Sequence, residues 1–234
     1  MTRLTRAAGR EPEWNAEARI GGDFRLMRSE SRATGRGAPD PLLPGYPARM
    51  RLFIAIPLSP DAAGALRAVR DRFASSAAGL RWSADDAWHV TLQFLGETTS
   101  EQAACITASL AGIHARQVPV RLTGLGFFDK AGVFHAGVDH TPELLALQQQ
   151  VLAATRACGI IPEPRAYNAH ITLARAKGHT GAKALAPLKE ALRRSGVTLA
   201  AQFVADEFLL YESFPGPDGS RYEARARFPL AAPS

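Results

Sequence analysis

The chain has 234 residues, of which 46% are hydrophobic and 21% charged, so collagen, coiled coil and wholesale disorder are excluded. This length predicts one or two domains, which need no disulfide or metal to build a core. The net charge of +6 is compatible with a nucleic-acid or phosphate partner. No apolar run approaches the roughly 18 residues of a membrane span, and the N-terminus lacks the apolar region of a secretory signal. We therefore expect a soluble cytoplasmic protein with no membrane partner.

The composition changes near Met50. Residues 1–49 hold nine arginines and six acidic residues, and the Gly- and Pro-rich stretch 35–45 cannot sustain a helix or a strand. We predict that 1–49 is a disordered or weakly ordered basic extension and that 50–234 forms the folded domain. The extension could be a basic arm for RNA or a passive tail, and composition favours the tail.

From Arg51 onward, strand and helix patterns interleave. Strands are predicted at 52–56, 88–95, 118–127, 133–138, 169–174, 203–211 and 221–228. Helices are predicted at about 61–75, 100–110, 142–159 and 182–194, and the first three follow capping Ser, Thr or Asp residues. Several strands are joined as hairpins, which predicts an α+β domain with mainly antiparallel sheets and with helices packed outside.

Two cysteines, Cys105 and Cys158, lie on predicted helices. Two thiols without a C-x-x-C pair cannot form a tetrahedral thiolate site, so we expect neither a structural zinc nor any other metal. We expect both cysteines to behave as small apolar residues.

A short internal repeat carries the candidate chemistry. His89-Val90-Thr91-Leu92 recurs 81 residues later as His170-Ile171-Thr172-Leu173, each time in a predicted strand. Side chains alternate along a strand, so each His and the Thr two residues later share one face, while their apolar neighbours face the core. The simplest arrangement is two pseudo-equivalent lobes whose polar strand faces meet in a central cleft.

Two imidazoles and two hydroxyls in one cleft suit phosphate-ester chemistry. A neutral His can take a proton from water while a protonated His gives one to the leaving oxygen. The Thr hydroxyls can donate hydrogen bonds to phosphate oxygens, and no metal or other cofactor is needed.

The paired H-x-T-L motifs resemble the 2H phosphoesterase superfamily, and within it the RNA 2′,3′-cyclic phosphodiesterases, also called 2′-5′ RNA ligases. The similarity covers about 50–230 and includes the stretches 51–57, 81–82, 89–97, 170–175, 209–213 and 219–222. The resemblance implies a bilobal, pseudo-symmetric fold. It also implies metal-independent hydrolysis of RNA 2′,3′-cyclic phosphate ends to 2′-phosphomonoesters, with reverse ligation to a 5′-hydroxyl.

By the same resemblance, His89 is the acid, His170 the base, and Thr91, Thr172 and Arg175 hold the phosphate. The residues themselves do not decide which histidine is the acid. Arg175 comes five residues after His170 and would face away from it in an uninterrupted strand, so it reaches the site only if the strand ends or bulges near Ala174.

Two positions depart from the family pattern. Ala169 stands where Pro often precedes the second His, and His135 stands where the family often has Trp. We expect His135 to be a half-buried strand residue, with stacking on a base as the alternative.

The expected partners are RNA ends or nucleoside 2′,3′-cyclic phosphates, and we expect a monomer. Two alternatives stay open. One is a related phosphodiesterase acting on 2′-5′ oligoadenylate, an ADP-ribose cyclic phosphate or another small cyclic nucleotide metabolite. The other is an RNA-end-binding protein with little turnover, although simple binding does not require two groups that titrate near neutrality.

Overall fold

The computed structural model describes residues 49–178, 181–216 and 219–232. The predicted extension 1–49 therefore lies outside the described residues, except for Arg49. That residue already opens the first strand, where it pairs with Thr99. In the described part of the chain, no helix has the length and apolar character that crossing a membrane requires.

Two antiparallel sheets form the folded part of the chain. The four-stranded sheet has the order β3-β1-β8-β9, and the five-stranded sheet has the order β2-β6-β5-β4-β7. The strands of the first are β1 (Arg49–Pro57), β3 (His89–Thr99), β8 (Glu207–Phe214) and β9 (Arg221–Pro229). Those of the second are β2 (Leu80–Trp82), β4 (Val118–Phe128), β5 (Val133–Val138), β6 (His170–Ala176) and β7 (Gln202–Ala205). The predicted α+β class with antiparallel pairing is confirmed.

Each sheet carries one of the two H-x-T motifs, because β3 and β6 begin at the two histidines. The chain moves between the sheets four times, since β1, β3, β8 and β9 belong to one sheet and the strands between them in sequence to the other. The two motifs therefore lie in different sheets, and each sheet is assembled from separated stretches of sequence.

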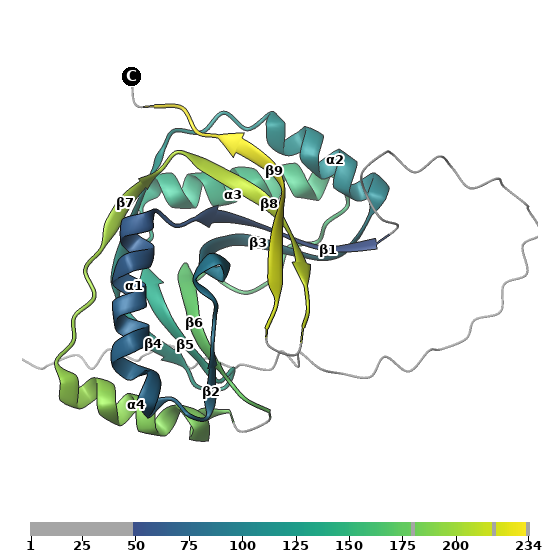
Figure 1. Ribbon diagram of the computed structural model, residues 1–234. Coiled ribbons are helices and arrows are strands. Elements are labelled where there is room, and N and C mark those ends of the chain that lie inside the picture. Colours follow the sequence, from purple (N-terminus) through teal and green to yellow (C-terminus); the bar gives the residue numbers. More distant parts are fainter. Residues whose placement is uncertain (1–48, 179–180, 217–218, 233–234) are drawn as a thin grey trace, which may run out of the picture. The chain divides into compact units, whose positions relative to one another are not determined.

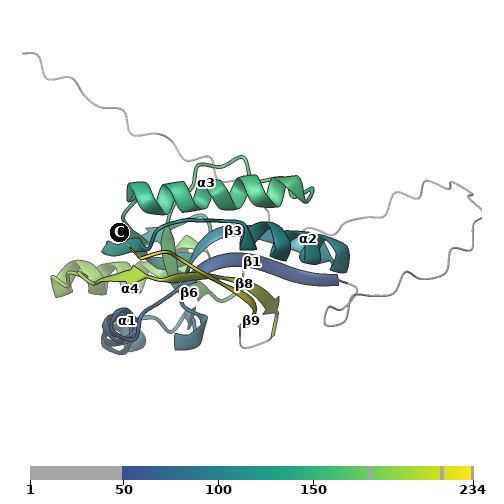
Figure 2. The same ribbon diagram turned by 90° about the horizontal axis from the view of Figure 1, so that it is seen from above.

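The helices pack on the outside of these sheets (Figure 1). They are α1 (Pro60–Phe73), α2 (Ser100–Ala111), α3 (Pro142–Ala157) and α4 (Ala182–Ser195). Helices α2 and α3 pack on each other and on β3, whereas α4 contacts α1 and β6. Figure 2 shows α3 and α1 on opposite sides of the strands.

The first three helices begin at Ser or Thr residues that cap them, as the sequence predicts. The hydroxyls of Ser59, Thr99 and Thr141 accept hydrogen bonds from backbone N–H groups in the first turns of α1, α2 and α3. At α2 the arrangement is reciprocal, because the Gln102 side chain also accepts a bond from the Thr99 N–H.

One predicted strand is in fact two. The stretch 203–211 was expected to run continuously, but β7 ends at Ala205 and β8 begins at Glu207. The first pairs with β4 and the second with β1, so the chain changes sheets at Asp206. Apolar alternation alone could not reveal this change of partner, because both segments carry strand-forming residues.

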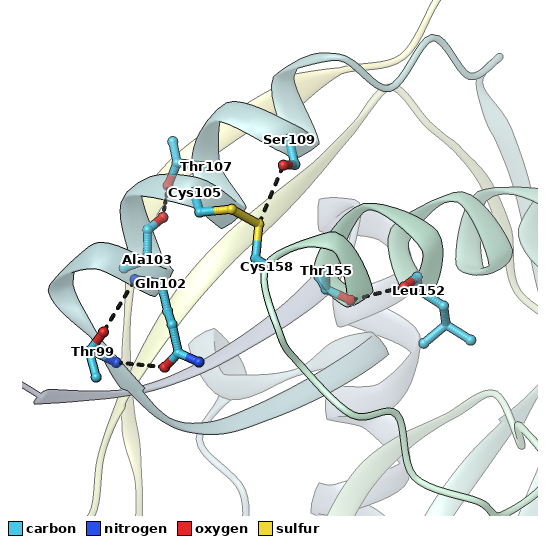
Figure 3. The surroundings of a disulfide bond; sticks show 9 residues. All are labelled: Thr99, Gln102, Ala103, Cys105, Thr107, Ser109, Leu152, Thr155 and Cys158. Carbon is cyan, nitrogen blue, oxygen red and sulfur yellow. Dashed lines mark hydrogen bonds between the residues drawn. A yellow bond between two sulfur atoms is a disulfide. The ribbon is translucent and has the colours of Figure 1, made fainter.

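The expectation for the cysteines was wrong. Cys105 on α2 and Cys158 at the end of α3 form a disulfide with a Cα–Cα distance of 5.8 Å (Figure 3). The bond joins two cysteines that are 53 residues apart in sequence. The pairing depends on which faces of the two helices meet, and two isolated cysteines give no sign of that in the sequence.

Candidate active site

The two repeated histidines occupy matching positions. His89 and His170 are the first residues of β3 and β6, and both are partly buried. The Nδ1 atom of His89 lies 2.8 Å from the Ala87 carbonyl oxygen, and the Nδ1 atom of His170 lies 2.8 Å from that of Asn168. A carbonyl can only accept, so Nδ1 carries the proton in both rings. This leaves each neutral ring with a lone pair on Nε2, which is the atom able to accept or donate a proton at the site.

The alternation predicted for the motifs is present in both strands. Val90 and Leu92 on β3, like Ile171 and Leu173 on β6, are almost completely buried. Thr91 and Thr172 are only partly buried and share the face of their histidine. The sequence therefore identified both polar strand faces correctly.

The fold brings the two faces together. The phenolic hydroxyl of Tyr167, just before β6, donates a 2.9 Å hydrogen bond to the Thr91 carbonyl oxygen of β3. Burial lowers the pKa of His89 to about 4, and the charges of His170 and Arg175 act in the same direction. Burial also lowers the pKa of His170, assisted by Arg175 and Arg165. Both imidazoles and Arg175 therefore share one electrostatic environment.

A bulge places Arg175 on the face of the histidine. Phe134 pairs with Ala174 and His135 with Thr172, so Leu173 is an extra residue in β6. One extra residue reverses the alternation beyond it, which returns Arg175 to the side of Thr172. The bulge near Ala174 that Arg175 needs in order to reach this face is therefore present. The same irregularity occurs at Leu92 of β3, because Ile54 pairs with Gln93 and Ala55 with Thr91.

The sequence of this chain matches the model of a known protein family. The model of the LigT-like phosphoesterases matches residues 56–135 and 138–222, which is most of the chain. The chain belongs to the LigT-like phosphoesterase family.

Two curated relatives carry the name RNA 2′,3′-cyclic phosphodiesterase. The protein from Aeropyrum pernix is 34% identical over 137 residues, which cover 57% of this chain and 76% of that protein. The protein from Geobacillus stearothermophilus is 30% identical over 192 residues, which cover 78% of this chain but only 58% of the longer relative.

Solved structures show the same fold. LigT of E. coli has a TM-score of 0.64 and 23% identity, with 79% of this chain and 99% of that chain covered. A protein of Thermus thermophilus, TT0787, has a TM-score of 0.62 and 24% identity, with 78% and 99% covered. The predicted 2H phosphoesterase fold is thereby confirmed.

The LigT-like site has an aromatic wall around His89 that sequence reasoning missed. The His89 ring lies 4.7 Å from the ring centroid of Phe53 and 5.2 Å from that of Tyr222. Tyr211 stacks on Phe53 at 5.1 Å, and its ring centroid lies 6.2 Å from that of His89. These residues come from β1, β8 and β9, so only the strand order of the sheet could have associated them with His89.

His135 forms the corresponding surroundings of His170. It lies half-buried on β5 opposite Thr172, as expected, and its ring centroid is 5.5 Å from that of His170. The imidazole stacks on Phe128 at 4.0 Å. A Cβ at Gly126 would lie 2.8 Å from its Cε1 atom, so glycine there makes room for the ring. Burial lowers the pKa of His135 to about 4, with His170 contributing, which keeps this ring neutral beside the catalytic candidate.

His140 supports the segment before β6. The residue is exposed, yet its Nε2 accepts a 3.0 Å hydrogen bond from the Ala169 N–H. Its ring stacks on Tyr167 at 5.8 Å. Pro at position 169 could not donate this bond, so the departure from the family pattern has a structural use here.

Among residues 49–178, 181–216 and 219–232, no cluster of three or more His, Cys, Asp or Glu side chains could hold a metal ion. The groups that the fold brings together are two imidazoles, two hydroxyls and a guanidinium. Such a set can move protons and bind a phosphate.

Proposed function

We propose that this protein hydrolyses RNA 2′,3′-cyclic phosphate ends to 2′-phosphomonoesters by metal-independent acid–base catalysis. The observation that carries the proposal is the pair of histidines. The Nδ1–H of each histidine donates a hydrogen bond to the carbonyl oxygen two residues before it. Each histidine is also the first residue of its strand, β3 in one sheet and β6 in the other. Two rings with the same fixed tautomer leave two Nε2 atoms for the two proton transfers of one displacement.

In the proposed reaction, water attacks phosphorus and the bond to the 3′-oxygen breaks. His170 Nε2 takes the proton from water, and the protonated Nε2 of His89 gives its proton to the departing 3′-oxygen. The product is a 2′-phosphomonoester with a free 3′-hydroxyl. The roles of acid and base follow the family resemblance, and the two rings exchange them in the reverse reaction.

The lowered pKa values of both rings affect when the acid acquires its proton. In the free protein at neutral pH both imidazoles are largely neutral, because burial disfavours their charged forms. An anionic phosphate between them favours the charged form. We therefore expect the substrate and one proton to bind together.

Thr91, Thr172 and Arg175 are proposed to hold the phosphate. The two hydroxyls can donate hydrogen bonds to non-bridging oxygens, and the guanidinium can donate two parallel bonds. All three lie on the histidine faces of their strands. As charge develops on these oxygens, the donors stabilise the transition state more than the bound substrate.

The relatives support this substrate class. Both curated proteins are named RNA 2′,3′-cyclic phosphodiesterase, and E. coli LigT has been crystallised with 3′-AMP and with phosphate. Joining of two RNA ends is the same displacement with a 5′-hydroxyl in place of water: the bond from phosphorus to the 5′-oxygen forms, the bond to the 3′-oxygen breaks, and the product is a 2′-5′ linkage. It is the reverse of the cleavage of such a linkage to a cyclic phosphate and a 5′-hydroxyl. For the molecule as a whole, we propose a monomer in the cytoplasm, where RNA ends are available. Sedimentation of the pure protein and cell fractionation test these two points.

The decisive experiment incubates the protein with each of the four nucleoside 2′,3′-cyclic phosphates in excess chelator. His89→Ala and His170→Ala should each reduce turnover by about 10²–10⁴-fold. The double variant should be much less than multiplicatively worse, since both groups serve one displacement. His114→Ala, an exposed histidine outside the site, is the matched control and should keep full activity.

The dependence of kcat/KM on pH should be bell-shaped, with limbs that belong to the coupled pair. A metal requirement, or near-normal turnover by either single variant, would overturn the mechanism. Hydrolysis of 2′-5′ oligoadenylate or another small cyclic metabolite in preference to all four nucleoside cyclic phosphates would show that the protein is a phosphodiesterase for that metabolite and not for RNA ends. Tight RNA binding without product at any pH would indicate a binding protein.

A further inference from the structure

A second arginine lies next to Arg175 on the same sheet face. Arg81 of β2 is the direct cross-strand partner of Arg175 of β6. Directly opposed residues of an antiparallel pair project to the same side of the sheet. Both arginines are exposed, and the neighbours Leu80 and Ala174 are buried. Arg81 therefore shares the face that also carries Thr172 and His170.

The backbone of β2 is held firmly at both ends. The Lys177 N–H bonds the Gly79 carbonyl at 3.0 Å, and the Ser83 N–H bonds the Leu173 carbonyl at 2.8 Å. Next to Arg81, the Trp82 indole packs edge-on against the buried Phe134 at 5.8 Å. The strand is thus an anchored platform that fixes the starting point of the Arg81 side chain.

The two opposed cations repel each other. The Arg175 side chain reaches solvent, but the protein around its guanidinium partly desolvates it, and this lowers its pKa. Tyr222 acts in the opposite direction, and the charge of Arg81 lowers the pKa further. Like charges placed directly across a strand pair are unfavourable by themselves. An anion that contacts both guanidinium groups, or a chain of anions that follows them, turns this repulsion into attraction. The pair is therefore suited to bind more negative charge than one phosphate carries.

The polar groups on this face form a row from the histidine to the edge of the sheet, and an extended ligand can lie along this row. His170, Thr172 and Arg175 lie on β6, and Arg81 lies on β2, which is one of the two edge strands of the five-stranded sheet. Neighbouring strands are about 5 Å apart, so Arg81 is one step further from the histidines than Arg175. A substrate whose cyclic phosphate lies at Thr172 and Arg175 can continue toward Arg81.

We propose that Arg81 binds the phosphodiester group that precedes the terminal cyclic phosphate, so that the site prefers RNA ends to mononucleotides. This inference rests on the proposed function. It assigns to the LigT-like site a second anion position, whose ligand is the next phosphate of a ribonucleotide chain.

The test compares Arg81→Met with the unmodified protein on two substrates. One is a nucleoside 2′,3′-cyclic phosphate, and the other is a dinucleotide that ends in the same cyclic phosphate. Arg81→Met should lose about tenfold in kcat/KM on the dinucleotide, as expected for one charge-assisted contact, and less than about twofold on the mononucleotide. Arg156→Met, at an exposed arginine in the last turn of α3, is the matched control and should change neither value.

Salt dependence provides a second readout. Removal of one phosphate contact should make kcat/KM less sensitive to salt on the dinucleotide and leave the salt dependence on the mononucleotide unchanged. Equal losses on both substrates would overturn the inference, since Arg81 would then act on the reacting phosphate or on the shape of the site. An unchanged dinucleotide value would overturn it as well. Failure of the unmodified protein to turn over either substrate would instead refute the proposed function, and the inference with it.

Discussion

Replacement of both Cys105 and Cys158 by serine should lower the free energy of unfolding by about 4 kcal/mol. The bond closes a loop of 53 residues, and the chain-entropy relation for a loop of that length gives this value at 25 °C. Measured effects of disulfides are commonly 2–4 kcal/mol, so the calculated figure lies at the upper end. For a domain of this size the melting temperature should fall on the order of 10 °C.

Urea unfolding followed by circular dichroism measures the change. Reduction of the unmodified protein with dithiothreitol should give the same midpoint as the double serine variant, because both open the same loop. Ala108→Ser, which makes a small exposed change on the same helix, is the matched control and should leave the midpoint nearly unchanged.

The double serine variant of Cys105 and Cys158 should keep its kcat/KM within about twofold, because the disulfide joins outer helices and touches none of the groups in the site. Thiol titration of the unfolded, unreduced protein should find no free thiol. Two titratable thiols in that sample, or an unfolding midpoint that reduction leaves in place, would refute the reasoning.

Tyr167→Phe removes the bond to the Thr91 carbonyl and should cost about 1–2 kcal/mol in urea unfolding, with a severalfold fall in kcat/KM; wild-type values in both assays would contradict this. Stability should decline as pH falls from 6.5 toward 4, because the rings of His89 and His135, whose pKa values are about 4, take up protons more readily in the unfolded chain. The loss between pH 7.5 and 5 should be about 2 kcal/mol for each ring, and equal urea midpoints at both pH values would exclude it. A chain that begins at Met50 should keep its melting temperature and its turnover; a turnover loss beyond about tenfold would place the preceding residues in the site.

The parts of the site that were predictable are those encoded locally. Each H-x-T-L motif contains its own alternation of polar and apolar residues, so the shared face of His89 and Thr91 follows from four adjacent letters. The position of Arg175 could be stated only as a condition. Whether β6 bulges depends on its register with β5, and that register involves residues about 40 positions away.

The remaining features depend on tertiary pairing. Phe53 and Tyr222 lie next to His89 only because β8 and β9 are added to the edge of β1. The disulfide likewise requires a particular face of α2 to meet the end of α3. The contact between His140 and the Ala169 N–H joins a loop to a strand entry 29 residues later, and no periodic pattern marks either partner.

The strand order also has a consequence for how the protein is made. β1 lies between β3 and β8, and it contains the apolar stretch 52–56. Its partner β8 begins only at Glu207, so during synthesis one side of β1 has no partner until most of the chain has left the ribosome. An unpaired apolar strand edge is a template for association with other chains. Nascent or prematurely terminated chains that lack the last hairpin should therefore depend on chaperones to stay in solution.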